Sequence, residues 1–164
     1  MSVSGSAPVE RIVGRLLKIK GLTLAVAESC TGGLVGDRIT NVPGSSNYFR
    51  GGVIAYSDDA KKKLLGVSGR TLQKWGAVSE QTVSEMAAGV SSRLGADVGV
   101  SVSGIAAPGG GSGVKPVGLV YICVKTGTTL AVERHRFRGG RRAVKEQSAA
   151  AALELCRRVL EDEA

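Results

Sequence analysis

Apolar residues recur along this chain with two periods, one helical and one typical of short buried strands. Residues 8–20 carry apolar side chains at helical spacing, and Gly21 follows them as a natural helix stop. Ser57 is a good N-cap with two acidic residues in the turn after it, so a short helix is expected there. The pattern therefore predicts helices at 8–20, 34–40, from 57 onward, 79–94 and 139–160.

Between these helices lie apolar runs that are too short to be helical. They predict strands at 22–27, 48–56, 98–103, 117–125 and 129–137. The last two are joined at Thr126-Gly127-Thr128 and are predicted to form a hairpin. Because helices and strands alternate without a linker or a repeat, we predict a single α/β domain over residues 1–164. Its sheet of about five strands is mixed, since the hairpin adds an antiparallel pair.

Length and cysteine content limit the class of protein. The 164 residues suit one domain, and no apolar run approaches the roughly 20 residues of a transmembrane helix. The N-terminus lacks the pattern of a signal peptide, so we expect a cytoplasmic protein without membrane contact. Cys30, Cys123 and Cys156 show no C-x-x-C spacing, which indicates reduced thiols rather than a disulfide frame or a zinc site.

The single histidine and the basic charge limit the kinds of site and the kinds of partner that the chain can have. His135 cannot form a multi-histidine metal site, and its neighbours include no Asp, so we expect it to be structural. The chain has 22 Lys and Arg against 14 Asp and Glu, a net charge of +8 that suggests an anionic partner. Nucleic acid, a membrane surface and a phosphorylated small molecule all fit. With only 4% aromatic residues, however, the chain offers few platforms for stacking bases.

A glycine-containing turn after the first predicted strand is one candidate site. Residues 28–33 read Glu-Ser-Cys-Thr-Gly-Gly and lead into a helix, where open α/β sheets commonly bind ligands. Ser29 would present a hydroxyl there, and N–H groups at the helix start could bind an anion or an oxyanion. Cys30 is a rival nucleophile, and a capping serine in a glycine turn is the plainer interpretation.

A serine nucleophile needs a proton acceptor, and residues 56–61 offer two. A lysine can accept a proton when desolvation lowers its pKa, so either Lys61 or Tyr56 fits this role. The run Lys61-Lys62-Lys63 is also typical of a solvated helix face. Residues 104–116 form a long glycine loop that is either functional or a flexible surface segment. For most of the basic residues between 134 and 145 we expect a solvated edge of the sheet, although an arginine beside the start of the last helix would make a good phosphate clamp.

Together these motifs resemble the CinA C-terminal domain family. The resemblance covers about Val9 to Leu160. It rests on residues 27–33, 43–46, 48–49, 51–53, 55–57, 60–61, 76–80, 85–87, 103–106, 108, 110–111 and 115–118. The family fold is a three-layer α/β/α sandwich with a mixed sheet of about five strands, which agrees with the pattern above. CinA proteins also have a second, N-terminal domain, for which 164 residues leave no room, so we expect the stand-alone form.

The resemblance implies a nicotinamide mononucleotide amidohydrolase of pyridine nucleotide salvage. Such an enzyme hydrolyses the carboxamide to give nicotinate mononucleotide and ammonia, and we expect a metal-independent Ser/Lys mechanism without a cofactor. The expected partner is the small nucleotide substrate, and a homo-oligomer is left open. By position, Ser29 is the nucleophile or catalytic hydroxyl, and Lys61 is the base, supported by Tyr56. The implied substrate-binding residues are Thr31, Gly32, Gly33, Ser103, Gly104 and Arg141.

Three positions depart from the family pattern. Ala107 stands in place of a glycine, Gly140 in place of Asp, and Asp58 in place of Asn. The Ala107 methyl is expected near the substrate, and Gly140 removes a carboxylate next to Arg141. These departures and the basic charge motivate an alternative: a catalytically weak or inactive nucleotide- or nucleic-acid-binding module of the same fold.

Overall fold

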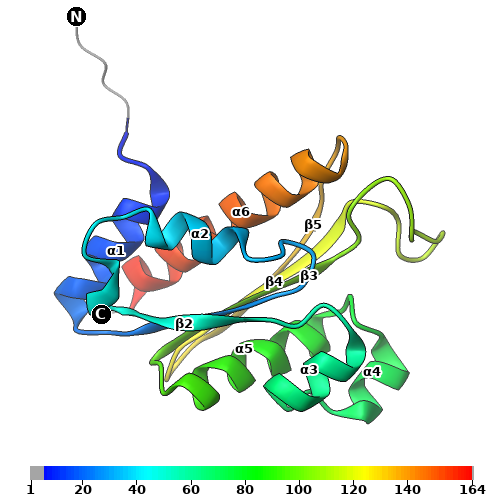
Figure 1. Ribbon diagram of the computed structural model, residues 1–164, viewed down its shortest axis with the longest axis horizontal. Helices are drawn as coiled ribbons and strands as arrows, with labels where there is room; N and C mark the ends of the chain where they lie inside the picture. The colour runs from blue at the N-terminus through cyan, green and yellow to red at the C-terminus, as the bar shows by residue number, and fades with distance from the viewer. Residues whose placement is uncertain (1–5, 164) are drawn as a thin grey trace, which may run out of the picture.

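A mixed five-stranded sheet lies between two layers of helices in the computed structural model, which describes residues 6–163 (Figure 1). One layer contains α1 (Val9–Lys20), α2 (Leu34–Thr40) and α6 (Arg141–Asp162). The other contains α3 (Asp58–Leu65), α4 (Gly69–Trp75) and α5 (Glu80–Leu94). The strands are β1 (Leu24–Glu28), β2 (Phe49–Ile54), β3 (Val98–Gly104), β4 (Leu119–Lys125) and β5 (Leu130–Arg136). The predicted α/β/α sandwich with a mixed sheet is confirmed.

The strand order, β2-β1-β3-β4-β5, determines where a ligand site can form. Strand β1 pairs in parallel with both β2 and β3, whereas β4 is antiparallel to β3 and forms the predicted hairpin with β5. The chain leaves β1 toward β2 on one side and returns to β3 on the other. The carboxyl ends of β1 and β3 therefore meet at a topological switch point, where such sheets bind ligands.

Burial on both faces explains why β1 is continuously apolar up to its last residue. Leu24 and Val26 belong to the core under α1, α2 and α6, and Ala25 and Ala27 belong to the core under α3, α4 and α5. All five residues of the strand are buried. A strand covered by helices on both faces has no solvated side, so it lacks the usual alternation of polar and apolar residues.

The predicted helices agree closely with the structure, but some boundaries differ. Helix α4 was not predicted, because its seven residues contain few apolar positions; the Ser68 hydroxyl caps it. The expected 41–47 loop contains a short 3₁₀ turn, Ser45–Asn47. The last helix begins at Arg141 rather than at residue 139, because Gly139 has φ +106°, which does not belong to a right-handed helix.

Other expectations concern single side chains. The Nε2 atom of His135 lies 2.8 Å from Oε2 of Glu133, and its ring stacks on Phe137, which is consistent with a structural role. The three cysteines are free and buried, and burial raises the pKa of each thiol to about 12. Among residues 6–163, no helix combines the length and apolar character needed to cross a membrane.

Candidate functional site

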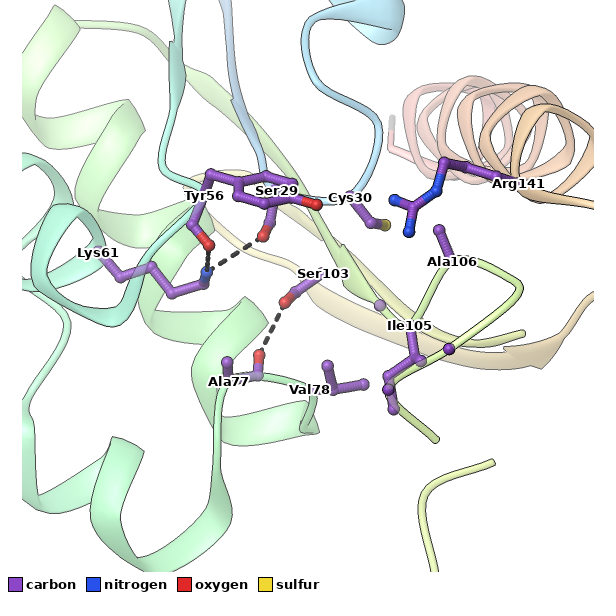
Figure 2. A pocket seen from close by; sticks show the side chains of 13 residues that line it. Ser29, Cys30, Tyr56, Lys61, Ala77, Val78, Ser103, Ile105, Ala106 and Arg141 are labelled. Atoms are coloured by element: carbon purple, nitrogen blue, oxygen red, sulfur yellow. Dashed lines mark hydrogen bonds between the residues drawn. The ribbon is translucent and has the colours of Figure 1, made fainter. Parts of the chain in front are cut away.

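A cavity of about 240 Å³ opens at the carboxyl ends of β1 and β3 (Figure 2). Most of the residues predicted for the site line this one cavity: Ser29, Tyr56, Lys61, Ser103, Gly104 and Arg141. They come from strands, loops and helices that are far apart in the sequence. The switch point of the sheet is what brings them together.

Ser29 is held at the end of β1 by its own backbone. Its N–H donates to the carbonyl of Val102 over 3.0 Å, which extends the pairing of β1 with β3 by one residue. Its side chain is only 6% exposed. The hydroxyl therefore sits on the rigid edge of the sheet, where a reacting group is held precisely enough for chemistry.

The turn after Ser29 is anchored by the carboxylate of Glu28, a buried residue. Glu28 Oε1 accepts hydrogen bonds from the N–H groups of Gly33 (3.2 Å) and Val35 (2.9 Å), and Oε2 accepts one from Gly36 (3.0 Å). The carboxylate thus occupies the start of α2, where free N–H groups attract anions. This role was not predicted from the sequence, although an acid just before a helix is a recognisable signal.

Two N–H groups of the glycine turn, which was expected to contact the substrate, have partners within the protein. The N–H of Gly33 donates to Glu28, and the N–H of Gly32 donates to the carbonyl of Ser29 (3.1 Å), so neither is free for a ligand. Thr31, Gly32 and Gly33 line a neighbouring pocket with Arg142 and Lys145, not the cavity of Ser29. The N–H of Cys30 donates to no acceptor within residues 6–163 and adjoins the Ser29 hydroxyl.

Lys61 reaches Ser29 from α3 and is almost fully buried, with 1% of its surface exposed. Its Nζ lies 3.1 Å from Ser29 Oγ, 2.9 Å from the carbonyl oxygen of Ala55 and 3.4 Å from that of Tyr56. Carbonyl oxygens only accept hydrogen bonds. A neutral Lys61 can therefore donate both its hydrogens to the two carbonyls and direct its lone pair at the Ser29 hydroxyl.

The environment favours this neutral form. Burial lowers the pKa of Lys61, because removal from water disfavours the charged ammonium, while Asp58 and Cys30 act in the opposite direction. A lysine with a lowered pKa that contacts a serine hydroxyl can take the proton of that hydroxyl. The pair thus has the geometry and the electrostatics of a nucleophile and its base.

Tertiary packing decides that Lys61 is buried while Lys62 and Lys63 are exposed. The Ser57 hydroxyl caps α3 by accepting from the N–H of Ala60 over 3.0 Å, as predicted. Helix α5 approaches the end of α3 closely at Gly89, where a Cβ would lie 1.9 Å from the carbonyl oxygen of Leu65. The solvated-face interpretation of the lysine run is therefore correct for two residues and wrong for Lys61.

Tyr56 contributes differently from the expectation. Its phenol borders the cavity, but the side chain is 66% exposed. Only its backbone carbonyl contacts Lys61. Of the two candidate proton acceptors, the geometry favours Lys61, since no hydrogen bond joins the phenol to Ser29 among residues 6–163.

The opposite wall of the cavity includes Ser103 and the turn between α4 and α5. Ser103 donates from Oγ to the carbonyl of Ala77 over 2.8 Å. Gly104 packs tightly, because a Cβ there would lie 2.6 Å from Val120 Cγ2. Ala77 and Val78 also line the cavity and were not predicted as site residues, because small apolar side chains carry no chemical signal in a sequence.

Arg141 lies at the cavity as the first residue of α6 and is exposed. No side chain of residues 6–163 caps this end of the helix, so its N–H groups and the guanidinium favour a negative charge. Within residues 6–163, no three His, Cys, Asp or Glu side chains gather in a way that could hold a metal ion.

Comparison with known proteins identifies the group to which this architecture belongs. The model of the CinA C-terminal domain matches residues 6–160, nearly the whole chain. The chain belongs to the CinA C-terminal domain family. Among the relatives, a CinA-like protein of Kosmotoga olearia is 48% identical over 156 residues, and one of Thermotoga maritima is 50% identical over 152. These matches cover 95% and 93% of this chain but only 38% and 37% of those relatives.

The fold is also that of CinA superfamily structures. The competence damage-inducible protein A from Klebsiella pneumoniae has a TM-score of 0.92 at 32% identity, covering 95% of this chain and 97% of that one. The competence/damage inducible protein CihA from Agrobacterium tumefaciens has a TM-score of 0.89 at 38% identity, covering 99% and 100%.

Of the departures from the CinA pattern, Ala107 is buried and does not line the cavity.

Proposed function

We propose that this chain is an amidohydrolase that converts nicotinamide mononucleotide to nicotinate mononucleotide and ammonia. The observation that carries the proposal is the contact between Lys61 Nζ and Ser29 Oγ inside a cavity at the switch point of the sheet. The resemblance of the motifs to CinA C-terminal domains supports the substrate. The names of the relatives are compatible with this activity but do not specify it.

The residues of the cavity suffice for amide hydrolysis in two steps. Lys61 takes the proton of Ser29 as Oγ attacks the carboxamide carbon, and it then gives that proton to the leaving nitrogen, which departs as ammonia. The acyl group is left on Ser29. Water then attacks the ester, with Lys61 as its base, and releases the carboxylate product and the free hydroxyl.

Two further groups would assist this reaction. The N–H of Cys30, a residue that lines the cavity and directly follows the nucleophile, would donate to the oxyanion that forms during attack. Arg141 would hold the phosphate at the edge of the cavity, with the uncapped start of α6 adding a favourable potential. The basic charge of the chain suits an anionic nucleotide.

The test is direct assay of the purified protein. It is incubated with nicotinamide mononucleotide, and ammonia and nicotinate mononucleotide are quantified. Ser29→Ala and Lys61→Ala are expected to lose turnover, whereas the matched control Lys62→Ala, which alters the exposed neighbour on the same helix, is expected to keep it. Turnover that persists in Ser29→Ala would overturn the assignment of the nucleophile.

A binding module without catalysis is the alternative. Three exposed arginines that do not line the cavity favour it: Arg134 and Arg136 in β5, and Arg138 just after that strand. It predicts that the wild-type protein binds the nucleotide or a duplex without producing ammonia. Duplex binding would weaken steeply with salt and depend on these arginines.

A further inference from the structure

Ser103 is the cross-strand neighbour of Ser29. Glu28 pairs with Val102 in the parallel register of β1 and β3, so Ser29 and Ser103 occupy the next positions of the two strands. Both side chains line the cavity, as Figure 2 shows, and Ser103 is only 1% exposed. A carbonyl group attacked by Ser29 would therefore have one of its substituents close to the wall that Ser103 forms.

The hydrogen of the Ser103 hydroxyl has a fixed direction. Its partner at 2.8 Å is the carbonyl oxygen of Ala77, which can only accept, so Ser103 must be the donor. A hydroxyl that donates its single hydrogen has only lone pairs left for any other partner. Toward the cavity, Ser103 therefore acts as a hydrogen-bond acceptor.

The Ala77 carbonyl is held in place by a second set of hydrogen bonds. Gly76 is the residue before Ala77. Its carbonyl accepts hydrogen bonds from the hydroxyls of Ser79 and Thr82, over 3.0 and 2.7 Å. The N–H of Thr82 donates to Ser79 Oγ in turn. This network fixes the turn that carries Ala77, so the Ser103 hydroxyl cannot reverse without leaving a carbonyl unpaired.

We infer that Ser103 determines specificity for a carboxamide over the corresponding carboxylate. Its lone pairs accept a hydrogen bond from the amide NH₂ and hold the leaving nitrogen in place while Lys61 protonates it. The same lone pairs repel the oxygen of a carboxylate, which favours release of the product. This inference rests on the proposed function and adds the residue that distinguishes substrate from product.

The experiment compares two serine variants of the same strand. Ser103→Ala is expected to lower kcat/KM for nicotinamide mononucleotide by roughly three- to tenfold, the effect of one neutral hydrogen bond. It is also expected to lower the inhibition constant of nicotinate mononucleotide, which means tighter binding of the product, because the lone pairs of Ser103 no longer repel its carboxylate. Ser101→Ala is the matched control: Ser101 donates to the carbonyl of Val83 over 2.6 Å from the same face of β3 but does not line the cavity.

The decisive quantity is the ratio of kcat/KM for the amide to the affinity for the acid. We expect this ratio to fall in Ser103→Ala. It should keep the wild-type value in Ser101→Ala and in Ser103→Thr, which keeps the hydroxyl. An unchanged ratio in Ser103→Ala overturns the inference. If Ser103→Ala does not fold, Ser103→Cys replaces it, since a thiol is a weak acceptor and should also lower the ratio. Failure of the wild-type protein to release ammonia would instead refute the proposed function itself.

Discussion

Replacing Lys61 with methionine should separate activity from stability. Methionine has a similar length and no charge, so it fits the buried site without needing hydration. If Lys61 is the base, Lys61→Met lowers kcat/KM for the amide by about 10²- to 10⁴-fold, the usual contribution of a positioned acid–base group. The folded structure is expected to persist, because the variant removes a costly buried amine.

The structure sets the expected change in the free energy of unfolding. The variant loses three hydrogen bonds of Nζ, to the carbonyls of Ala55 and Tyr56 and to the hydroxyl of Ser29, each worth about 1 kcal/mol. It gains an apolar side chain in place of a polar one that is 1% exposed, which offsets a loss of this size. We therefore expect a net change smaller than about 2 kcal/mol at neutral pH.

The pH dependence follows from the sign of the pKa shift. Burial places the pKa of Lys61 in the folded protein below its ordinary 10.5, so the unfolded chain holds the extra proton between the two values. The burial penalty in the wild type is complete below the folded pKa and disappears as the pH rises to 10.5. The stability of Lys61→Met relative to the wild type should thus be greatest at low pH and decline as the pH rises.

Urea unfolding at several pH values and an ammonia-release assay measure both effects. The wild-type rate should rise with pH through the lowered pKa of Lys61. Activity of Lys61→Met within tenfold of the wild type would refute the reasoning about the base. A relative stability that does not vary with pH would refute the reasoning about burial.

Three other substitutions test separate parts of the site. Glu28→Gln should lower the free energy of unfolding by about 1–3 kcal/mol in urea, since one end of the amide would present a donor to backbone N–H groups; unchanged stability would contradict this. Gly104→Ala places a methyl 2.6 Å from Val120 and should cost about 1–3 kcal/mol by the same measurement, and a neutral result would show that the strands yield there. Arg141→Ala should raise KM for the nucleotide roughly tenfold or more while hydrolysis of the nucleoside without phosphate is unaffected; equal losses with both substrates would exclude a phosphate contact.

Local signals were enough to predict most of the fold. Ser57 and Ser79 cap α3 and α5, and Gly21 and Gly95 end α1 and α5 in the left-handed region, as their positions in the sequence indicate. Helix α4 was missed, because its seven residues contain few apolar positions. The three layers were expected only from the resemblance, and the strand order came only from the structure, because pairing between distant strands leaves no local pattern.

The features of the site could likewise be predicted only where a local motif marks them. The hydroxyl of Ser29 and the glycine turn were visible as a motif, but the hydrogen bonds that join the end of this turn and the start of α2 to the carboxylate of Glu28 were not. The direction in which a backbone N–H points depends on the folded turn, so the sequence could not show that these donors were already taken. The same holds for the carbonyl of Ala77, which any residue would supply.

The sequence by itself determined the periodic elements, the capped helices, the mixed sheet and the residue types at the site. Each of these depends on neighbours within a few positions or on the total composition. Only the tertiary structure decided that one lysine of three is buried against Ser29, since exposure depends on how α3 packs on α5. It also decided to which carbonyl each hydroxyl donates its hydrogen. The basic charge suggested an anionic partner, and the structure puts one arginine at the cavity while Arg134, Arg136 and Arg138 remain on the surface.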